Sequence, residues 1–279
     1  MLAAHPGSFF CYVTKTPTFI GSLLGSRANT DQAVNDRLDR YAEASSRRSQ
    51  TQQLSTSPQT QVQKFVYPGG GVTVQPAVEA ITDELVRVTP YVQQSKDTIL
   101  VFFGALSNLQ DLLTRSRSGD SSHEGAGIGA LTTACLLDLY RNFDDGRELL
   151  MLSELQGQFA FVLYDSSRKQ AFAARDPSGA EPLYYKIDED GGVQYTNALE
   201  QLPPGDAEGR SWKELQPGHY MLGKTVAQFA LSLRQLETRE RKESQDAESL
   251  HAMLQRGSHS REEERGGFSV RSLLRNRSK

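Results

Sequence analysis

The fold of this chain is decided by the stretch LQGQFAFVLYD, residues 155–165. From Phe159 to Tyr164 large apolar side chains alternate with smaller ones, a pattern typical of a buried β-strand. Asp165-Ser166-Ser167 follows, and these residue types favour a reversal of the chain. Another apolar run at 171–174 then predicts a second strand directly after this turn.

Further strands and helices are expected on both sides of this stretch. The run from Thr98 to Phe103 is β-branched, aromatic and apolar, and Gly104 ends it, so a buried strand is predicted there. Strands without strict alternation with helices indicate an α+β fold. The other predicted strands are 9–13, 19–20, 183–186, 193–196 and 219–222, and the predicted helices are 126–140 and 148–155.

Composition divides the chain into segments of different character. Fourteen of the twenty residues 45–64 are Ser, Thr or Gln, which bury too little to offset the entropy of ordering them. After the globular part of the sequence comes a charged stretch, for which we expect a helix and then a tail. We therefore expect four parts: N-terminal strands of the domain at 1–30, a low-complexity insertion at 31–71, a core at 72–224, and a charged helix with a disordered tail at 225–279.

The charge and the cysteine count exclude several classes of function. The net charge of -3 gives no reason to expect nucleic acid or an anionic membrane as partner. Two cysteines cannot build a disulfide framework, so a reducing compartment is expected. No apolar run approaches the length of a membrane span. The five histidines show no metal spacing, and we expect no metal and no cofactor.

Four pieces of the sequence, in order, resemble the glutaminase domain of asparagine synthetases, a class-II glutamine amidotransferase domain. The pieces are 155–165, 174–185, 195–200 and 215–220. Met1-Leu2-Ala3 and the strand Lys96–Gly104 add a closer resemblance to the plant stem-specific, aluminium-induced protein family. The resemblance implies the four-layer αββα sandwich of N-terminal-nucleophile hydrolases. It also implies a stress-responsive protein in cytosol or nucleus, with organellar targeting less favoured.

The resemblance marks ten residues as structural members of the family motifs rather than as catalysts. Arg175 and Asp176 are expected to anchor a turn. The ten residues are Gly104, Gly157, Phe159, Asp165, Arg175, Asp176, Gly179, Pro182, Pro217 and Gly218.

The groups that the resemblance requires for glutamine hydrolysis are missing. Active members use an N-terminal cysteine whose α-amino group activates its own thiol, and Leu2 stands at that place. They hold glutamine with Asn-Gly-Glu where this chain has Phe103-Gly104-Ala105, and with a helix aspartate that residues 121–137 lack. We therefore expect no catalytic residue.

Two alternatives to a non-catalytic binding protein stay open. Cys11, expected to be a half-buried strand residue, would serve as nucleophile if the chain were cleaved before it. Otherwise the protein would act as a scaffold through its disordered segments, for which Arg275-Asn276-Arg277-Ser278 offers a docking or phosphorylation site. The expected partners are an unknown small ligand, a protein, or a second copy bound through a sheet edge.

Overall fold

The computed structural model describes residues 7–15, 27–51, 61–82, 85–116, 127–142, 148–206 and 211–231, together with 241, 242, 244, 245 and 248. The chain divides into two compact units, Met1–Ser232 and Leu233–Lys279. Only the five isolated residues belong to the second unit, so the fold described below is that of the first. No helix among these residues is long and apolar enough to cross a membrane.

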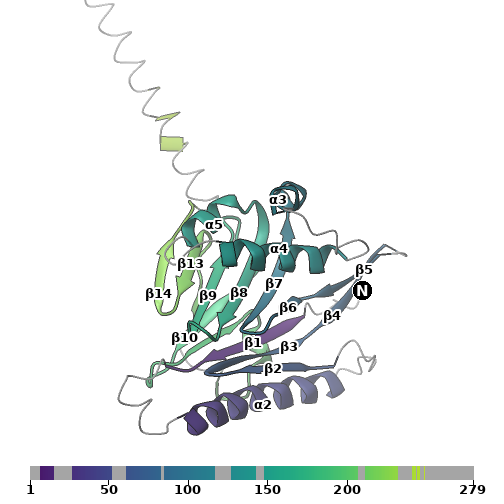
Figure 1. Ribbon diagram of the computed structural model, residues 1–279, viewed down its shortest axis with the longest axis vertical. Helices are drawn as coiled ribbons and strands as arrows, with labels where there is room; N and C mark the ends of the chain where they lie inside the picture. The colour runs from purple at the N-terminus through teal and green to yellow at the C-terminus, as the bar shows by residue number, and fades with distance from the viewer. Residues whose placement is uncertain are drawn as a thin grey trace, which may run out of the picture. The chain divides into compact units, whose positions relative to one another are not determined.

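Two six-stranded antiparallel sheets form the centre of the first unit (Figure 1). The first sheet has the order β12-β10-β11-β1-β3-β2, and the second has the order β14-β13-β9-β8-β7-β6. The strands of the first are β12 (Lys213–Glu214), β10 (Tyr184–Ile187), β11 (Val193–Thr196), β1 (Ser8–Val13), β3 (Gly70–Gln75) and β2 (Gln63–Tyr67). Those of the second are β14 (Thr225–Gln228), β13 (His219–Leu222), β9 (Gln170–Arg175), β8 (Gly157–Asp165), β7 (Thr98–Leu106) and β6 (Tyr91–Gln94).

Helices cover the outer face of each sheet. The long helix α2 (Arg27–Thr51) packs on the first sheet, where its buried side chains meet Phe10 and Tyr12 of β1. The helices α3 (Leu109–Ser116), α4 (Ile128–Asn142) and α5 (Glu148–Glu154) cover the second sheet. The order helix, sheet, sheet, helix is the four-layer αββα sandwich that the resemblance predicted. A separate hairpin of β4 (Ala77–Thr82) and β5 (Leu85–Thr89) and a short 3-10 helix, η2 (Leu199–Gln201), complete the elements.

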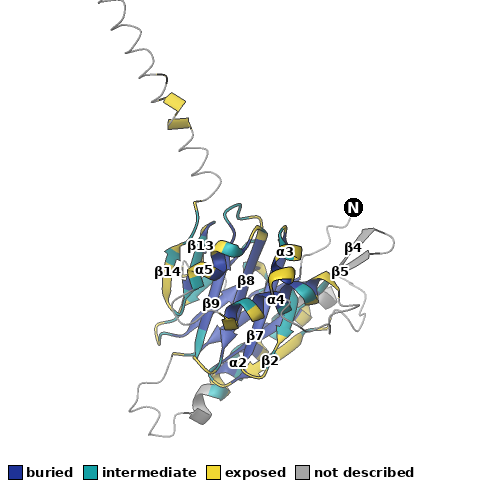
Figure 2. Cartoon of the chain, turned by 45° about the horizontal axis from the view of Figure 1, so that its top comes forward, coloured by how far each residue is buried: buried dark blue, intermediate teal, exposed yellow. Residues whose placement is uncertain are grey.

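The central strands are buried on both faces (Figure 2). In β1, Phe9 and Cys11 point into the core between the sheets, whereas Phe10 points toward α2. In β7, Val101 faces the core between the sheets and Phe102 faces the helices. Because successive side chains of a strand alternate between its two faces, a strand covered on both sides needs a continuous apolar run, which is what the sequence of β7 provides.

The prediction of a low-complexity insertion at 31–71 is wrong for most of that range. Residues 31–51 belong to α2, and 63–67 form β2. Val34, Leu38 and Tyr41 are fully buried against the first sheet. Their spacing of four and three residues places them on one helix face. The burial of this face stabilises the helix although most of its other residues are polar. Residues 52–60 lie outside the described part of the chain.

The core also extends beyond the predicted boundary at 224. The strand β14 pairs with β13 at the edge of the second sheet, so Thr225–Gln228 belongs to the domain. The strands β7 and β8 are longer than predicted and pair along their whole length, from Thr98 opposite Asp165 to Leu106 opposite Gly157. The predicted strand at 19–20 and nearly all of the predicted tail lie outside the described residues.

Candidate functional site

The resemblance to glutaminase domains places the glutamine centre where β1 begins and β7 ends. Phe9 of β1 and Phe103 of β7 meet there across the two sheets, with ring centroids 5.2 Å apart. Their side chains are 0% and 4% exposed. The resemblance places an asparagine of active members at Phe103. In this chain the same place is filled by apolar, tightly packed rings.

Gly104 follows Phe103 and brings β7 close to the neighbouring strand. Its φ is +88, and a Cβ there would overlap the backbone carbonyl of Gln158. Residues other than glycine rarely adopt that φ. Gly104 lies opposite Phe159 in the register. It therefore serves the close pairing of β7 with β8, and Ala105, which follows it, is exposed and has no polar side chain.

Asn197 fixes the start of β1. Its Oδ1 accepts a hydrogen bond from the amide of Phe9 at 3.0 Å, and its Nδ2 donates to the carbonyl of Gly7 at 2.9 Å. The hydroxyl of Thr196 donates to the carbonyl of Phe9 at 2.8 Å. These buried contacts hold the backbone of residues 7–9 beside Phe103. The sequence placed Asn197 in a family motif, but nothing local to it revealed this role.

Cys11 lies in the middle of β1 and is fully buried rather than half-buried as predicted. It pairs with Tyr195 on one side and Val72 on the other. Burial raises the pKa of its thiol far above the ordinary value. Since the thiolate is the nucleophilic form of cysteine, this environment works against a catalytic role for Cys11.

Arg175 and Asp176 are bonded to the protein itself. The guanidinium of Arg175 donates to the carbonyls of Leu215 at 2.9 Å and Gly179 at 2.7 Å, and pairs with Glu214 at 2.6 Å. It is 5% exposed. These contacts tie the end of β9 to the segments before β10 and β13.

The carboxylate of Asp176, directly after β9, binds backbone amides beside Arg175. It is fully buried and accepts from the amides of Phe159 at 3.0 Å, Ser178 at 2.7 Å and Gly179 at 3.2 Å. The amide of Gly218 donates to the backbone carbonyl of Asp176 at 3.0 Å. Pairing a buried carboxylate with several backbone amides offsets the cost of removing its charge from water.

The remaining motif residues shape turns around this corner or lie away from it. Gly179 and Gly218 have positive φ values of 66 and 73, which glycine adopts without strain, and the ring of Pro217 packs against Gly179. Pro182 is half-buried just before β10. Asp165 lies at the opposite end of β8, where its carboxylate accepts from the amide of Ser167 at 2.9 Å.

The structure brings most of the motif residues to one end of the sandwich. Gly104, Gly157, Phe159 and Asp176 meet where β8 begins. The start of α4, where active members carry an aspartate, has the exposed Ile128, and 117–126 lie outside the described residues. Within the described ranges no group of three or more metal-binding side chains occurs.

Residues 80–228 match the family model described as the glutamine amidotransferase domain. Since the match covers more than half of the 279 residues, the chain belongs to this family. The predicted resemblance to class-II glutamine amidotransferases is thereby confirmed. The closer resemblance to the plant aluminium-induced proteins stays a prediction.

Individual relatives are similar to the chain over part of its length. It is 32% identical over 142 residues to asparagine synthetase B [glutamine-hydrolyzing] of Escherichia coli K12, which is 51% of this chain and 24% of the synthetase. It is 28% identical over 114 residues to amidase chry2 of Gibberella zeae, covering 34% and 16% of the two chains. The chain thus spans about a quarter or less of the length of these relatives.

A solved structure with a similar arrangement is glutamine phosphoribosylpyrophosphate amidotransferase from B. subtilis. It is 16% identical, covering 81% of this chain and 50% of that one, with a TM-score of 0.48.

The buried ionisable groups predict a loss of stability at alkaline pH. Burial raises the pKa of the Cys135 thiol from 9.0 to about 11, and that of the Tyr41 phenol from 10.0 to about 12. The folded state therefore holds protons that the unfolded chain releases, so stability falls as pH rises above about 9 and continues to fall to about 12. Urea unfolding between pH 7 and pH 11 measures this.

A Cys135→Ala variant provides the control for that pH profile, because it removes one of the contributing groups. Its stability should fall less steeply between pH 9 and pH 11 than that of the wild type. Identical slopes in the two proteins would contradict the assignment of this part of the pH dependence to Cys135.

Proposed function

We propose that this protein is a non-catalytic member of the glutamine amidotransferase domain family that acts by binding or regulation. The observation that carries the proposal is the contact between Phe9 and Phe103, whose ring centroids lie 5.2 Å apart. The resemblance places the glutamine centre at this contact. Both side chains are buried.

Glutamine bound at this place would leave its charged groups without partners. Its ammonium and carboxylate would face the rings of Phe9 and Phe103, and Ala105 offers no side-chain acceptor. Burying such unpaired charges costs on the order of several kcal/mol or more. The nearby polar groups of Asn197 and Thr196 are already bonded to residues 7–9.

The second candidate is an amidohydrolase that uses Cys11. It is favoured by the names of the relatives, which include a glutamine-hydrolysing synthetase and an amidase. The full burial of Cys11 and its raised thiol pKa weigh against it. Exposure of the thiol would require β1 to separate from β3 and β11, with which it pairs.

The finer parts of the proposal have separate grounds. A role in stress responses and a location in cytosol or nucleus rest on the resemblance to the plant family alone. A partner that is a small ligand, a protein or a second copy rests on the pocket expected of the fold and on an exposed sheet edge. The scaffold alternative rests on the charged composition of the C-terminal segment. Retention of every partner after deletion of residues 257–279 would sink that alternative.

We expect the purified full-length protein to release no ammonia from glutamine above the background of a heat-denatured sample. Glutamine should also leave the melting temperature unchanged, because a ligand that binds the folded state raises it by mass action. An enzyme-coupled ammonia assay and a thermal-shift titration measure the two quantities.

A Cys11→Ala variant separates the two candidate functions. Ammonia release by the wild type that disappears in Cys11→Ala would overturn the non-catalytic proposal in favour of the amidohydrolase. Release that is equal in both would exclude Cys11 and would also contradict a non-catalytic protein. Only the absence of release in both supports the proposal.

A further inference from the structure

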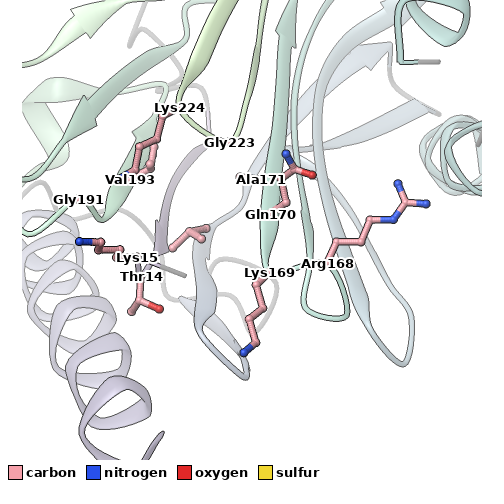
Figure 3. A pocket seen from close by; sticks show the side chains of 11 residues that line it. Thr14, Lys15, Arg168, Lys169, Gln170, Ala171, Gly191, Val193, Gly223 and Lys224 are labelled. Atoms are coloured by element: carbon pink, nitrogen blue, oxygen red, sulfur yellow. The ribbon is translucent and has the colours of Figure 1, made fainter. Parts of the chain in front are cut away.

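A cavity of about 240 Å³ lies at the end of the sandwich opposite the Phe9–Phe103 contact. Four separate segments line it: the end of β1 with the residues after it, the β8–β9 turn, the β10–β11 turn and the β13–β14 turn (Figure 3). Phe9 lies four residues before Val13, the β1 residue that lines the cavity, which is about 13 Å at the usual rise per residue. The cavity is therefore separate from the family's glutamine centre.

The cavity is lined by cations. Its eleven residues include three lysines and one arginine but no Asp or Glu, although the whole chain has a net charge of -3. The cationic residues are Lys15, Arg168, Lys169 and Lys224. Positive charge is thus concentrated at this cavity, although the net charge of the whole chain is negative.

Arg168 is already engaged by neighbouring groups. Its guanidinium lies 3.6 Å from the carboxylate of Asp165 and 5.2 Å from the ring centroid of Tyr140. Figure 3 shows its side chain directed away from the three lysines. The charge available to a ligand therefore comes from the lysines.

The three lysines have no carboxylate within ion-pair distance in the described part of the chain. Lys15 and Lys224 reach the same turn. A Cβ added at Gly191 would lie 2.5 Å from Nζ of Lys224 and 3.5 Å from Cδ of Lys15. Lys169 lines the cavity from the β8–β9 turn, and its side chain is directed away from Lys15 and Lys224 (Figure 3). Lys15 and Lys224 come from different sheets, so they bring positive charge to the cavity from two sides.

Two of the three carboxylates in the nearby β10–β11 turn, those of Asp188 and Asp190, have local partners, and the third, that of Glu189, is exposed. Asp188 accepts from Nε2 of Gln194 at 2.7 Å and lies 3.5 Å from the guanidinium of Arg37. Asp190 accepts from the amide of Gly192 at 3.0 Å. These contacts direct the two carboxylates to partners other than Lys15, Lys169 and Lys224.

We infer that this cavity binds a small molecule carrying one or two phosphate groups. Lysines bind phosphate as point charges, whereas carboxylate recognition favours the planar fork of arginine, and the arginine here is engaged. The volume of about 240 Å³ lies below the usual range for drug-sized ligands. A compact phosphorylated metabolite or pyrophosphate fits both the size and the charge.

Isothermal titration of the full-length protein with pyrophosphate tests this inference. We expect binding with a Kd below about 1 mM that weakens as potassium chloride is raised, because salt screens charge pairs. The double variant Lys15→Gln/Lys224→Gln should raise the Kd by about tenfold or more. Both lysines are exposed, so the variant should fold, and its unchanged melting temperature would verify that.

Lys213→Gln is the matched control, because Lys213 is an exposed lysine on the edge strand β12 and lies outside the cavity. It should bind pyrophosphate as the wild type does. Absence of binding by the wild type, or an equal loss in Lys213→Gln, would overturn the inference. Citrate that binds as tightly as pyrophosphate would overturn the assignment to phosphate. None of these outcomes depends on whether the protein hydrolyses glutamine.

Discussion

Replacing Gly104 with alanine is expected to lower the free energy of unfolding by about 3–5 kcal/mol. The new Cβ would overlap the carbonyl of Gln158 on the adjacent strand, and the backbone at φ +88 disfavours any residue other than glycine. Since β7 and β8 are neighbours within the second sheet, moving one away from the other would disturb both cores. Urea unfolding followed by circular dichroism measures the loss.

Gly127→Ala is the matched control for this substitution. Among the described residues no atom outside its neighbours lies within 4 Å of a Cβ added at Gly127, and its φ is not in the left-handed region. We expect a change within about 0.5 kcal/mol or a slight gain, since alanine restricts the unfolded chain. A loss below about 1 kcal/mol in Gly104→Ala would contradict the close approach of β7 and β8.

Replacing Asp176 with alanine is expected to cost about 3–5 kcal/mol. The carboxylate is fully buried and accepts from the amides of Phe159, Ser178 and Gly179. Its removal takes the side-chain acceptor away from the amides of Phe159 and Ser178, whereas the amide of Gly179 keeps the backbone carbonyl of residue 176. It also removes a negative charge from the corner that holds the buried Arg175. The melting temperature should fall by about 2–4 °C for each kcal/mol in a domain of this size.

Asp138→Ala serves as the comparison, because Asp138 is an exposed residue of α4. Its replacement should change stability by no more than about 0.5 kcal/mol. Asp176→Asn distinguishes geometry from charge, because it keeps one oxygen acceptor and loses the charge. Equal stability of wild type and Asp176→Ala would contradict a structural role for the buried carboxylate.

The central strands could be predicted from sequence because their own residues specify them. The run from Phe159 to Tyr164 is apolar on both faces, and this pattern is typical of a strand in a sheet that is covered on both sides. The helix α2 was not predicted, because most of its residues are polar and only a few apolar residues pack against the first sheet. Val34, Leu38 and Tyr41 bury one face, and their spacing would have revealed it.

The candidate site could be predicted only in part. Phe103 and Gly104 follow each other in a recognisable motif, so the loss of polar groups there was visible from sequence. The bonds from Asn197 to Gly7 and Phe9 join residues 190 and 188 positions apart. The lysines around the cavity come from distant turns. Only the folded sheets bring such residues together, because local patterns carry no information about them.

The central place of β1 in the first sheet has a consequence for biosynthesis. β1 pairs with β11, so Cys11 lies beside Tyr195, which the ribosome adds about 180 residues later. Contacts of such high sequence separation form slowly because a long loop must close first. Most of the chain must therefore leave the ribosome before β1 gains this partner, and until then its unpaired edge and apolar side chains are a surface for chaperones to shield.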